Sequence, residues 1–80
     1  MKTIHVHYNS LLYDQSGLTE ETIQTEAESP VVLFEELAKR HGFKVGCGIF
    51  KVIINDEMKS LTSPLKDGDM VSFHPPIAGG

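Results

Sequence analysis

The segment Pro75-Pro76-Ile77-Ala78-Gly79-Gly80 has the residue pattern with the clearest chemical use. The two prolines lack backbone N–H groups and fix their φ angles, so a strand ladder has to stop before them and an extended segment follows. The two glycines have no Cβ, and a carboxylate behind them fits into a narrow enzyme channel. We therefore interpret Gly80 as the carrier of a reactive carboxylate, with Gly79 keeping the segment slim.

A carboxylate presented in this way suits activation as an acyl-adenylate. The activated carbonyl then accepts sulfur and becomes a thiocarboxylate, with no side chain nearby to block it. From average glycine usage of about 7%, a terminal glycine pair arises by chance in roughly 0.5% of proteins, so the glycines alone also fit an ordinary chain end. Their position behind the proline pair favours the chemical interpretation. It predicts transient covalent forms at Gly80 and no permanently bound cofactor.

Histidines are the other candidate ligands. His5 and His7 are two residues apart on one face of a predicted strand, and His74 lies beside them if the first and last strands are neighbours. Three imidazoles could then gather a metal ion, but no carboxylate or thiolate is placed to join them. We expect exposed histidines or partner contacts and predict no metal site. His41, at a predicted helix end, suits packing and the helix dipole.

Cys47 lies between two glycines, and no residue next to it in sequence would lower its pKa, so we interpret it as a structural or incidental thiol. The chain has no glycine-rich phosphate loop, nucleophile elbow or pair of catalytic carboxylates. These observations indicate a protein that is not a self-contained enzyme.

The composition sets the frame for this chemistry. With 80 residues, 40% apolar and 22% charged, the chain predicts one folded domain. A single cysteine excludes an internal disulfide. The net charge of -4 and a pI near 5.4 argue against nucleic-acid binding. No apolar run approaches the roughly 20 residues that cross a bilayer, and we expect a cytoplasmic protein without membrane contact.

The first third of the chain predicts two strands. Residues 3–8 alternate in polarity, with Ile4, Val6 and Tyr8 on one face. Residues 9–17 are short and polar, and we expect a loop with one packed helical turn. Residues 20–26 predict a weaker strand that pairs with the first as a hairpin.

The strongest helix signal begins at Ser29-Pro30, a capping residue followed by a proline at the first helical position. Gly42 predicts its end. The apolar face consists of Leu33, Phe34, Leu37, Ala38 and His41, and the pairs Glu35/Lys39 and Glu36/Arg40 lie on the other face.

Residues 49–55 predict a strand that is apolar on both faces and therefore central, with Phe50, Val52 and Ile54 on one face and Ile49 and Ile53 on the other. A short strand at 58–61, a loop at 62–69 and a last strand at 70–73 follow. We predict an α+β roll, with a mixed sheet of four to five strands and one main helix on one face. Its domain comprises residues 1–74, and residues 75–80 form an extended tail.

Three apolar residues, Ile49, Ile53 and Met70, are expected on the sheet face opposite the helix, where no core would cover them. An exposed apolar patch marks a partner site. The alternative is a strand register shifted by one residue, which would bury them. The tail residues Pro75, Pro76, Ile77 and Ala78 are expected to contact the same partners.

Three segments together resemble the ubiquitin-like β-grasp sulfur carriers, and most closely the small subunits of molybdopterin synthase. They are the Ser29-Pro30 helix start, the Leu65-Lys66-Asp67-Gly68-Asp69-Met70-Val71 turn and strand, and the ending Phe73-His74-Pro75-Pro76-Ile77-Ala78-Gly79-Gly80. The similarity in length and element order covers the whole chain, and its most specific part is the last sixteen residues. The Gly-Gly ending is common to all these carriers, whereas Pro-Pro is more similar to the molybdopterin branch than to the thiamine branch.

The resemblance implies a cycle with three partners. An E1-like ATP-dependent enzyme would adenylate Gly80, a persulfide donor would supply the sulfur, and a large catalytic subunit would accept the tail and use the thiocarboxylate to build the dithiolene of molybdenum cofactor. The catalytic acids and bases would belong to that large subunit. The histidine-bearing strands and Gly46-Cys47-Gly48 have no role in this scheme.

Other functions remain open from the sequence. A carrier for thiamine synthesis or transfer-RNA thiolation would share the chemistry and differ in the receiving enzyme. An activated Gly-Gly carbonyl could also acylate lysine and conjugate proteins. A noncatalytic ubiquitin-like interaction module would not need the two glycines.

Overall fold

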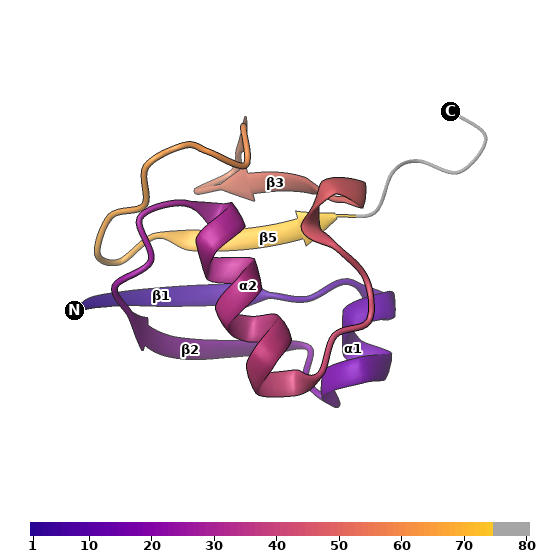
Figure 1. Ribbon diagram of the computed structural model, residues 1–80. Helices are drawn as coiled ribbons and strands as arrows, with labels where there is room; N and C mark the ends of the chain where they lie inside the picture. Colours follow the sequence, from indigo (N-terminus) through magenta and orange to yellow (C-terminus); the bar gives the residue numbers. More distant parts are fainter. Residues whose placement is uncertain (75–80) are drawn as a thin grey trace.

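The computed structural model describes residues 1–74, and the predicted tail at 75–80 lies outside the described residues (Figure 1). The elements in chain order are β1 (Lys2–His7), α1 (Ser10–Ser16), β2 (Glu20–Thr25), α2 (Pro30–His41), the 3-10 helix η1 (Cys47–Ile49), β3 (Lys51–Ile54), β4 (Glu57–Lys59) and β5 (Met70–His74).

The five strands form one mixed sheet in the order β2-β1-β5-β3-β4. β1 and β5 run parallel, whereas the β1–β2, β3–β5 and β3–β4 pairs are antiparallel. α2 crosses one face of this sheet, and α1 lies at the end of the sheet where β5 finishes (Figure 1). The predicted α+β roll with one main helix on one face is confirmed.

The core lies between α2 and the sheet. The strand residues that alternation placed inward are buried, and α2 contributes four residues with at most 2% exposure. The main core residues are Ile4, Val6, Ile23, Leu33, Phe34, Leu37, Phe50, Val52, Ile54, Val71 and Phe73. The strand register therefore agrees with the period of two in the sequence.

The segment after β1 differs from its prediction. Instead of a loop with one helical turn, the 7 residues Ser10–Ser16 form helix α1. Asn9 caps it by accepting a hydrogen bond from the Leu12 backbone N–H, and Gly17 ends it in the left-handed conformation at φ 78°. Leu12 is fully buried and fixes α1 to the core.

The predicted bounds of α2 are confirmed, with Gly42 at φ 72° after its last residue. Two details were wrong. The Ser29 side chain makes no capping hydrogen bond, and only its carbonyl accepts one, from Leu33 N–H at 2.9 Å. In the described part of the chain Arg40 pairs with Glu36 at 3.8 Å, but no Glu35–Lys39 ion pair forms.

The strand predicted from residue 49 begins two residues later. Cys47–Ile49 form η1, and β3 covers Lys51–Ile54. Ile49 therefore lies outside the strand, and it is 47% exposed. β3 has neighbours on both sides, but the central strand is β5, because β1 and β3 pair with its two edges.

Candidate functional site

The tail residues that the sequence assigned to chemistry and contact, Pro75, Pro76, Ile77, Ala78, Gly79 and Gly80, lie outside the described residues. The structure describes the base from which they continue. At this base Val52 pairs with Phe73 and Lys51 with His74. The tail therefore follows the central strand of the sheet rather than an edge strand.

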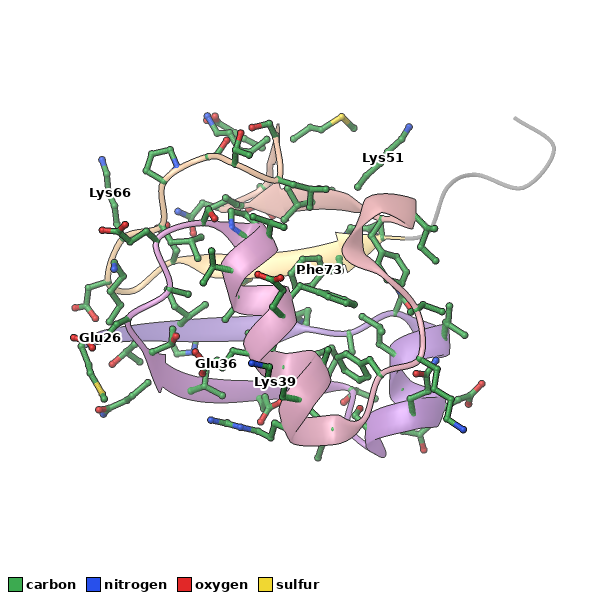
Figure 2. The ribbon with its side chains drawn as sticks, in the orientation of Figure 1. Glu26, Glu36, Lys39, Lys51, Lys66 and Phe73 are labelled. Atoms are coloured by element: carbon green, nitrogen blue, oxygen red, sulfur yellow. The ribbon has the colours of Figure 1, made fainter. Side chains whose placement is uncertain are left out.

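Aromatic packing holds the end of β5. Phe73 is 1% exposed and its ring meets Phe34 of α2 edge to face, with centroids 5.2 Å apart. The Phe50 ring lies 5.6 Å from Phe34 and 6.5 Å from Phe73. Figure 2 shows the Phe73 side chain on the α2 side of the sheet. These contacts fix the strand immediately before the tail, since aromatic pairs add to the stabilisation from buried area.

Asn9 is a second contact at this end, and sequence reasoning missed it. Its Nδ2 donates to the Phe73 carbonyl at 3.1 Å, while its Oδ1 accepts from Leu12 N–H at 2.9 Å. An asparagine directly before a helical segment is a signal for the cap, but only the tertiary structure reveals the contact with β5.

The start of β5 is held by hydrogen bonds. Asp69 is 9% exposed, and its carboxylate accepts from Asn55 Nδ2 at 2.9 Å and from Lys66 N–H at 2.8 Å. Asp67 accepts from Thr3 N–H at 2.6 Å. The Asp67-Gly68-Asp69 turn therefore joins β1, β5 and the β3–β4 hairpin, which is a structural role.

The sheet face opposite α2 carries an apolar patch, but its residues differ from those predicted. Ile53 and Met70 lie on this face, because their neighbours Val52, Ile54 and Val71 point into the core. Ile49 does not share their strand face, because it belongs to η1. Met58, which the sequence prediction missed, pairs with Ile53 across β3 and β4 and is 67% exposed. We call Ile53, Met58 and Met70 the outer-face patch.

β1 and β5 are neighbours, but the register sets His5 beside Met70 and His7 beside Ser72, whereas His74 pairs with Lys51 of β3. His5, His7 and His74 face outward, and His5 Nδ1 lies 2.9 Å from Thr22 Oγ1. Among residues 1–74 no three His, Cys, Asp or Glu side chains are placed to hold a metal ion.

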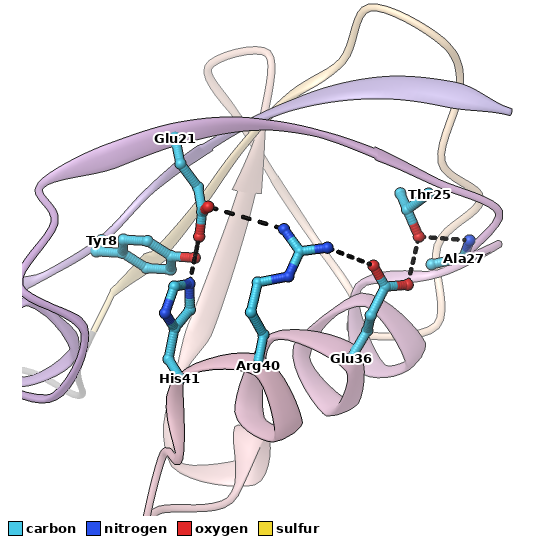
Figure 3. A network of polar contacts seen from close by, with 7 residues as sticks. All are labelled: Tyr8, Glu21, Thr25, Ala27, Glu36, Arg40 and His41. Carbon is cyan, nitrogen blue, oxygen red and sulfur yellow. Dashed lines mark hydrogen bonds and ion pairs between the residues drawn. The ribbon is translucent and has the colours of Figure 1, made fainter.

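A polar network connects α2 to β2 (Figure 3). Glu21 accepts hydrogen bonds from the Tyr8 hydroxyl and from His41 Nε2, the latter at 2.6 Å, and Arg40 lies 3.9 Å away. Burial alone would raise the pKa of the Glu21 carboxyl, but the hydrogen bonds from Tyr8 and His41 and the charges of His41 and Arg40 hold this pKa below its ordinary value. Burial, and then the bond to Glu21, raises the pKa of the Tyr8 phenol.

The network adds a partner to the predicted packing role of His41. The ring centroids of His41 and Tyr8 lie 6.0 Å apart, and His41 also contacts the Glu21 carboxylate on β2 directly. Arg40 continues the network to Glu36, which accepts from Thr25 Oγ1 at 2.6 Å. This network has a structural role, because each of its charged side chains contacts a residue on the neighbouring element and so holds α2 against β2.

A hollow of about 290 Å³ lies between the β3–β4 hairpin and the loop before β5. It is lined by Ile54, Asn55, Glu57, Lys59, Ser63, Pro64, Lys66 and Asp69. It adjoins the start of β5, at the opposite end of that strand from the tail. In residues 1–74 no helix has both the length and the apolar character needed to cross a membrane.

Comparison with curated proteins finds no match. Among solved structures, a putative molybdopterin converting factor subunit 1 from Pyrococcus furiosus is 29% identical, with a TM-score of 0.79 over 96% of this chain and 100% of that one. A chain in the complex of molybdopterin-converting factor subunits 1 and 2 from Helicobacter pylori is 28% identical, with a TM-score of 0.65 over 98% and 99%.

Urm1 from Trypanosoma brucei is 17% identical and shares the fold, with a TM-score of 0.66 over 99% of this chain and 96% of that one. The fold is therefore the ubiquitin-like β-grasp. The ThiS family pattern matches residues 6–80, which is nearly the whole sequence and includes Gly79 and Gly80. The chain belongs to the ThiS family of ubiquitin-like sulfur carriers.

Proposed function

We propose that this sulfur carrier receives its sulfur on Gly80 and donates it as the small subunit of a molybdopterin synthase. The observation that supports this proposal most is the family match through Gly80. Further support comes from identities of 29% and 28% to chains of two molybdopterin converting factors, each over nearly the full length of both chains.

The chemistry proceeds on the main chain. The Gly80 carboxylate attacks the α-phosphate of ATP, which gives the acyl-adenylate and releases pyrophosphate. A persulfide on a donor protein then attacks the acyl carbon and displaces AMP. A second thiol cleaves the resulting sulfur–sulfur bond, which leaves the thiocarboxylate on Gly80 and a disulfide on the donor. The thiocarboxylate sulfur finally attacks a carbon of the pterin precursor in the large subunit and displaces an oxygen substituent from it. Water then hydrolyses the resulting thioester, which leaves the sulfur on the pterin and regenerates the Gly80 carboxylate.

The folded domain contributes two things to this cycle, a fixed strand from which the tail continues and a surface for contact with the partners. β5 is held on both edges, so the tail begins from a fixed strand. The outer-face patch offers two exposed methionine side chains and Ile53 to the large subunit, and Met58 and Met70 are 67% and 43% exposed. Methionine suits a surface that meets more than one partner, because its side chain adapts its shape. We propose the same patch for the E1-like enzyme, together with the exposed Ile49 of η1.

Reconstitution with a defined receiving enzyme tests the pathway. The thiocarboxylated chain is mixed with a molybdopterin synthase large subunit and the cyclic pterin precursor, and dithiolene formation is measured. We expect sulfur transfer in step with loss of the thiocarboxylate. Parallel reactions with a thiamine-pathway thiazole synthase and a transfer-RNA thiolation enzyme are the controls. Transfer to one of these and none to the pterin precursor would overturn the molybdopterin assignment while leaving the carrier chemistry intact.

The contact surface is tested with matched surface variants. Met58→Ser with Met70→Ser should weaken binding to the large subunit roughly tenfold, because apolar residues at an interface centre provide most of the affinity. Val32→Ser is the control, since Val32 is 45% exposed on α2, on the other side of the sheet. Equal binding by both variants would show that the outer face is not the contact.

A further inference from the structure

We propose that Asn9 is a positioning residue for the tail, because its side chain supplies the last hydrogen bond that fixes β5 before the tail begins. This inference rests on the proposed function for its catalytic consequence and on the described contacts for its structural part. Asn9 makes two hydrogen bonds of opposite kind, as a cap acceptor for Leu12 N–H and as a donor to the Phe73 carbonyl.

The register of the parallel pair explains why this donor is needed. His5 and His7 lie beside Met70 and Ser72, and His5 N–H donates to the Asp69 carbonyl at 3.0 Å. Four residues further along both strands, the same pattern would bring the backbone N–H of residue 9 to the Phe73 carbonyl. β1 has ended at His7 by then, because the chain turns into α1.

The Asn9 side chain takes the place of that missing backbone donor. Its Nδ2 meets the Phe73 carbonyl at 3.1 Å, so this edge of β5 stays paired although β1 has turned away. The amide orientation follows from both contacts, since exchanging its oxygen and nitrogen would place a donor against Leu12 N–H and an acceptor against a carbonyl. The other edge is paired through Lys51 and His74. The two contacts together hold both edges of β5 up to its last residue, His74.

A fixed starting point lowers the cost of placing Gly80 in an enzyme channel. Only six residues separate His74 from the end of the sequence. They span at most about 20 Å when extended, so fraying of one or two residues of β5 alters a large part of the segment that must be ordered. Asn9 therefore acts on binding of the tail rather than on the chemical step.

The two roles of Asn9 separate by substitution. Asn9→Ser and Asn9→Asp retain a capping oxygen for α1 but lose the amide donor to Phe73. Gln15→Ala is the matched control. It removes another side-chain amide contact of α1, the acceptor for Lys44 N–H at 2.6 Å, and leaves β5 untouched.

The first readout needs no partner. Amide hydrogen exchange of Phe73 and His74 should accelerate roughly fivefold in both Asn9 variants, with Val71 unchanged. A fivefold change in the local opening equilibrium is about what the loss of one typical hydrogen bond produces. Gln15→Ala should leave all three rates as in the wild type. Unchanged exchange at Phe73 and His74 in the Asn9 variants, or equal acceleration in Gln15→Ala, would overturn the proposal.

The second readout uses ATP–pyrophosphate exchange by an E1-like enzyme that adenylates the wild-type chain. For both Asn9 variants the KM for the carrier should rise roughly three- to tenfold with kcat unchanged, whereas Gln15→Ala keeps the wild-type KM. A lower kcat at unchanged KM would contradict a positioning role. If no such enzyme adenylates the wild type, the proposed function fails and hydrogen exchange alone decides on Asn9.

Discussion

The two ends of β5 are held by different forces. At its start, polar groups meet around the turn Asp67-Gly68-Asp69, where side-chain carboxylates and Asn55 satisfy backbone N–H groups of neighbouring segments. At its end, Phe73 is enclosed by aromatic rings and a single side-chain amide reaches its carbonyl. Hydrogen bonds therefore hold the start of the strand, whereas at its end aromatic packing carries most of the stabilisation and the Asn9 hydrogen bond adds to it.

The aromatic end should show the largest effect on stability. Phe73→Ala removes a ring that is 1% exposed, and we expect a loss of about 3–5 kcal/mol in the free energy of unfolding, measured by urea titration. Phe73→Leu keeps most of the apolar volume and should lose about 1–2 kcal/mol. If Phe73→Ala cost no more than Phe73→Leu, packing would not be what anchors this end.

The polar end should come next. Asp69→Ala leaves Asn55 Nδ2 and Lys66 N–H without their acceptor, and we expect a loss of about 2–3 kcal/mol. Asp14→Ala, an exposed carboxylate on α1, is the control and should change stability by less than about 0.5 kcal/mol. Urea titration of both variants measures the difference in their free energies of unfolding. Equal losses would show that the hydrogen bonds of Asp69 do not stabilise the start of β5.

An electrostatic contribution near the aromatic end is testable by pH. The pKa of Glu21 is lower in the folded protein than its ordinary value of 4.5. The ionised Glu21 carboxylate therefore adds to the free energy of unfolding above pH 4.5, and this stabilisation disappears as the pH falls through the pKa of the folded state. Glu21→Gln should cost about 1 kcal/mol at pH 7, and its difference from wild type should narrow below pH 4.5. A difference in urea stability that stays constant down to pH 3 would exclude this charge effect. Glu35→Gln on α2 is the exposed control.

The smallest effect should come from a side chain at the polar end that faces outward. The Met70 backbone takes part in the contacts with Asn55, but its side chain is 43% exposed. Met70→Gln should therefore change the free energy of unfolding by less than about 0.5 kcal/mol in the same titration. A loss as large as that of Asp69→Ala would mean that the outer face is part of the folding core.

The sequence was sufficient for features that depend on periodicity. Alternation placed Ile4, Val6, Val71 and Phe73 inward, and Pro30 marked the start of α2. Features that depend on contacts between distant segments were missed. The sequence around Asn9 contains a signal for its capping role, but nothing in that sequence indicates its hydrogen bond to Phe73, 64 residues away.

The error at Ile49 has a similar origin. An apolar run from residue 49 to 54 fits a strand, but η1 occupies its beginning, and periodicity does not distinguish a short apolar turn from a strand. Met58 was missed because a three-residue strand carries too little alternation to assign a face. The outer-face patch thus depends on pairing across β3 and β4, which only the sheet register supplies.

Mass spectrometry of the intact protein with C-terminal fragmentation shows whether Gly80 carries the sulfur. The wild type and a variant lacking Gly80 are incubated with an E1-like enzyme, ATP and a persulfide donor. We predict exchange of one oxygen for one sulfur, located on Gly80 by the fragments, and none in the variant. Sulfur elsewhere in the chain, or equal loading of the shortened variant, would contradict the account.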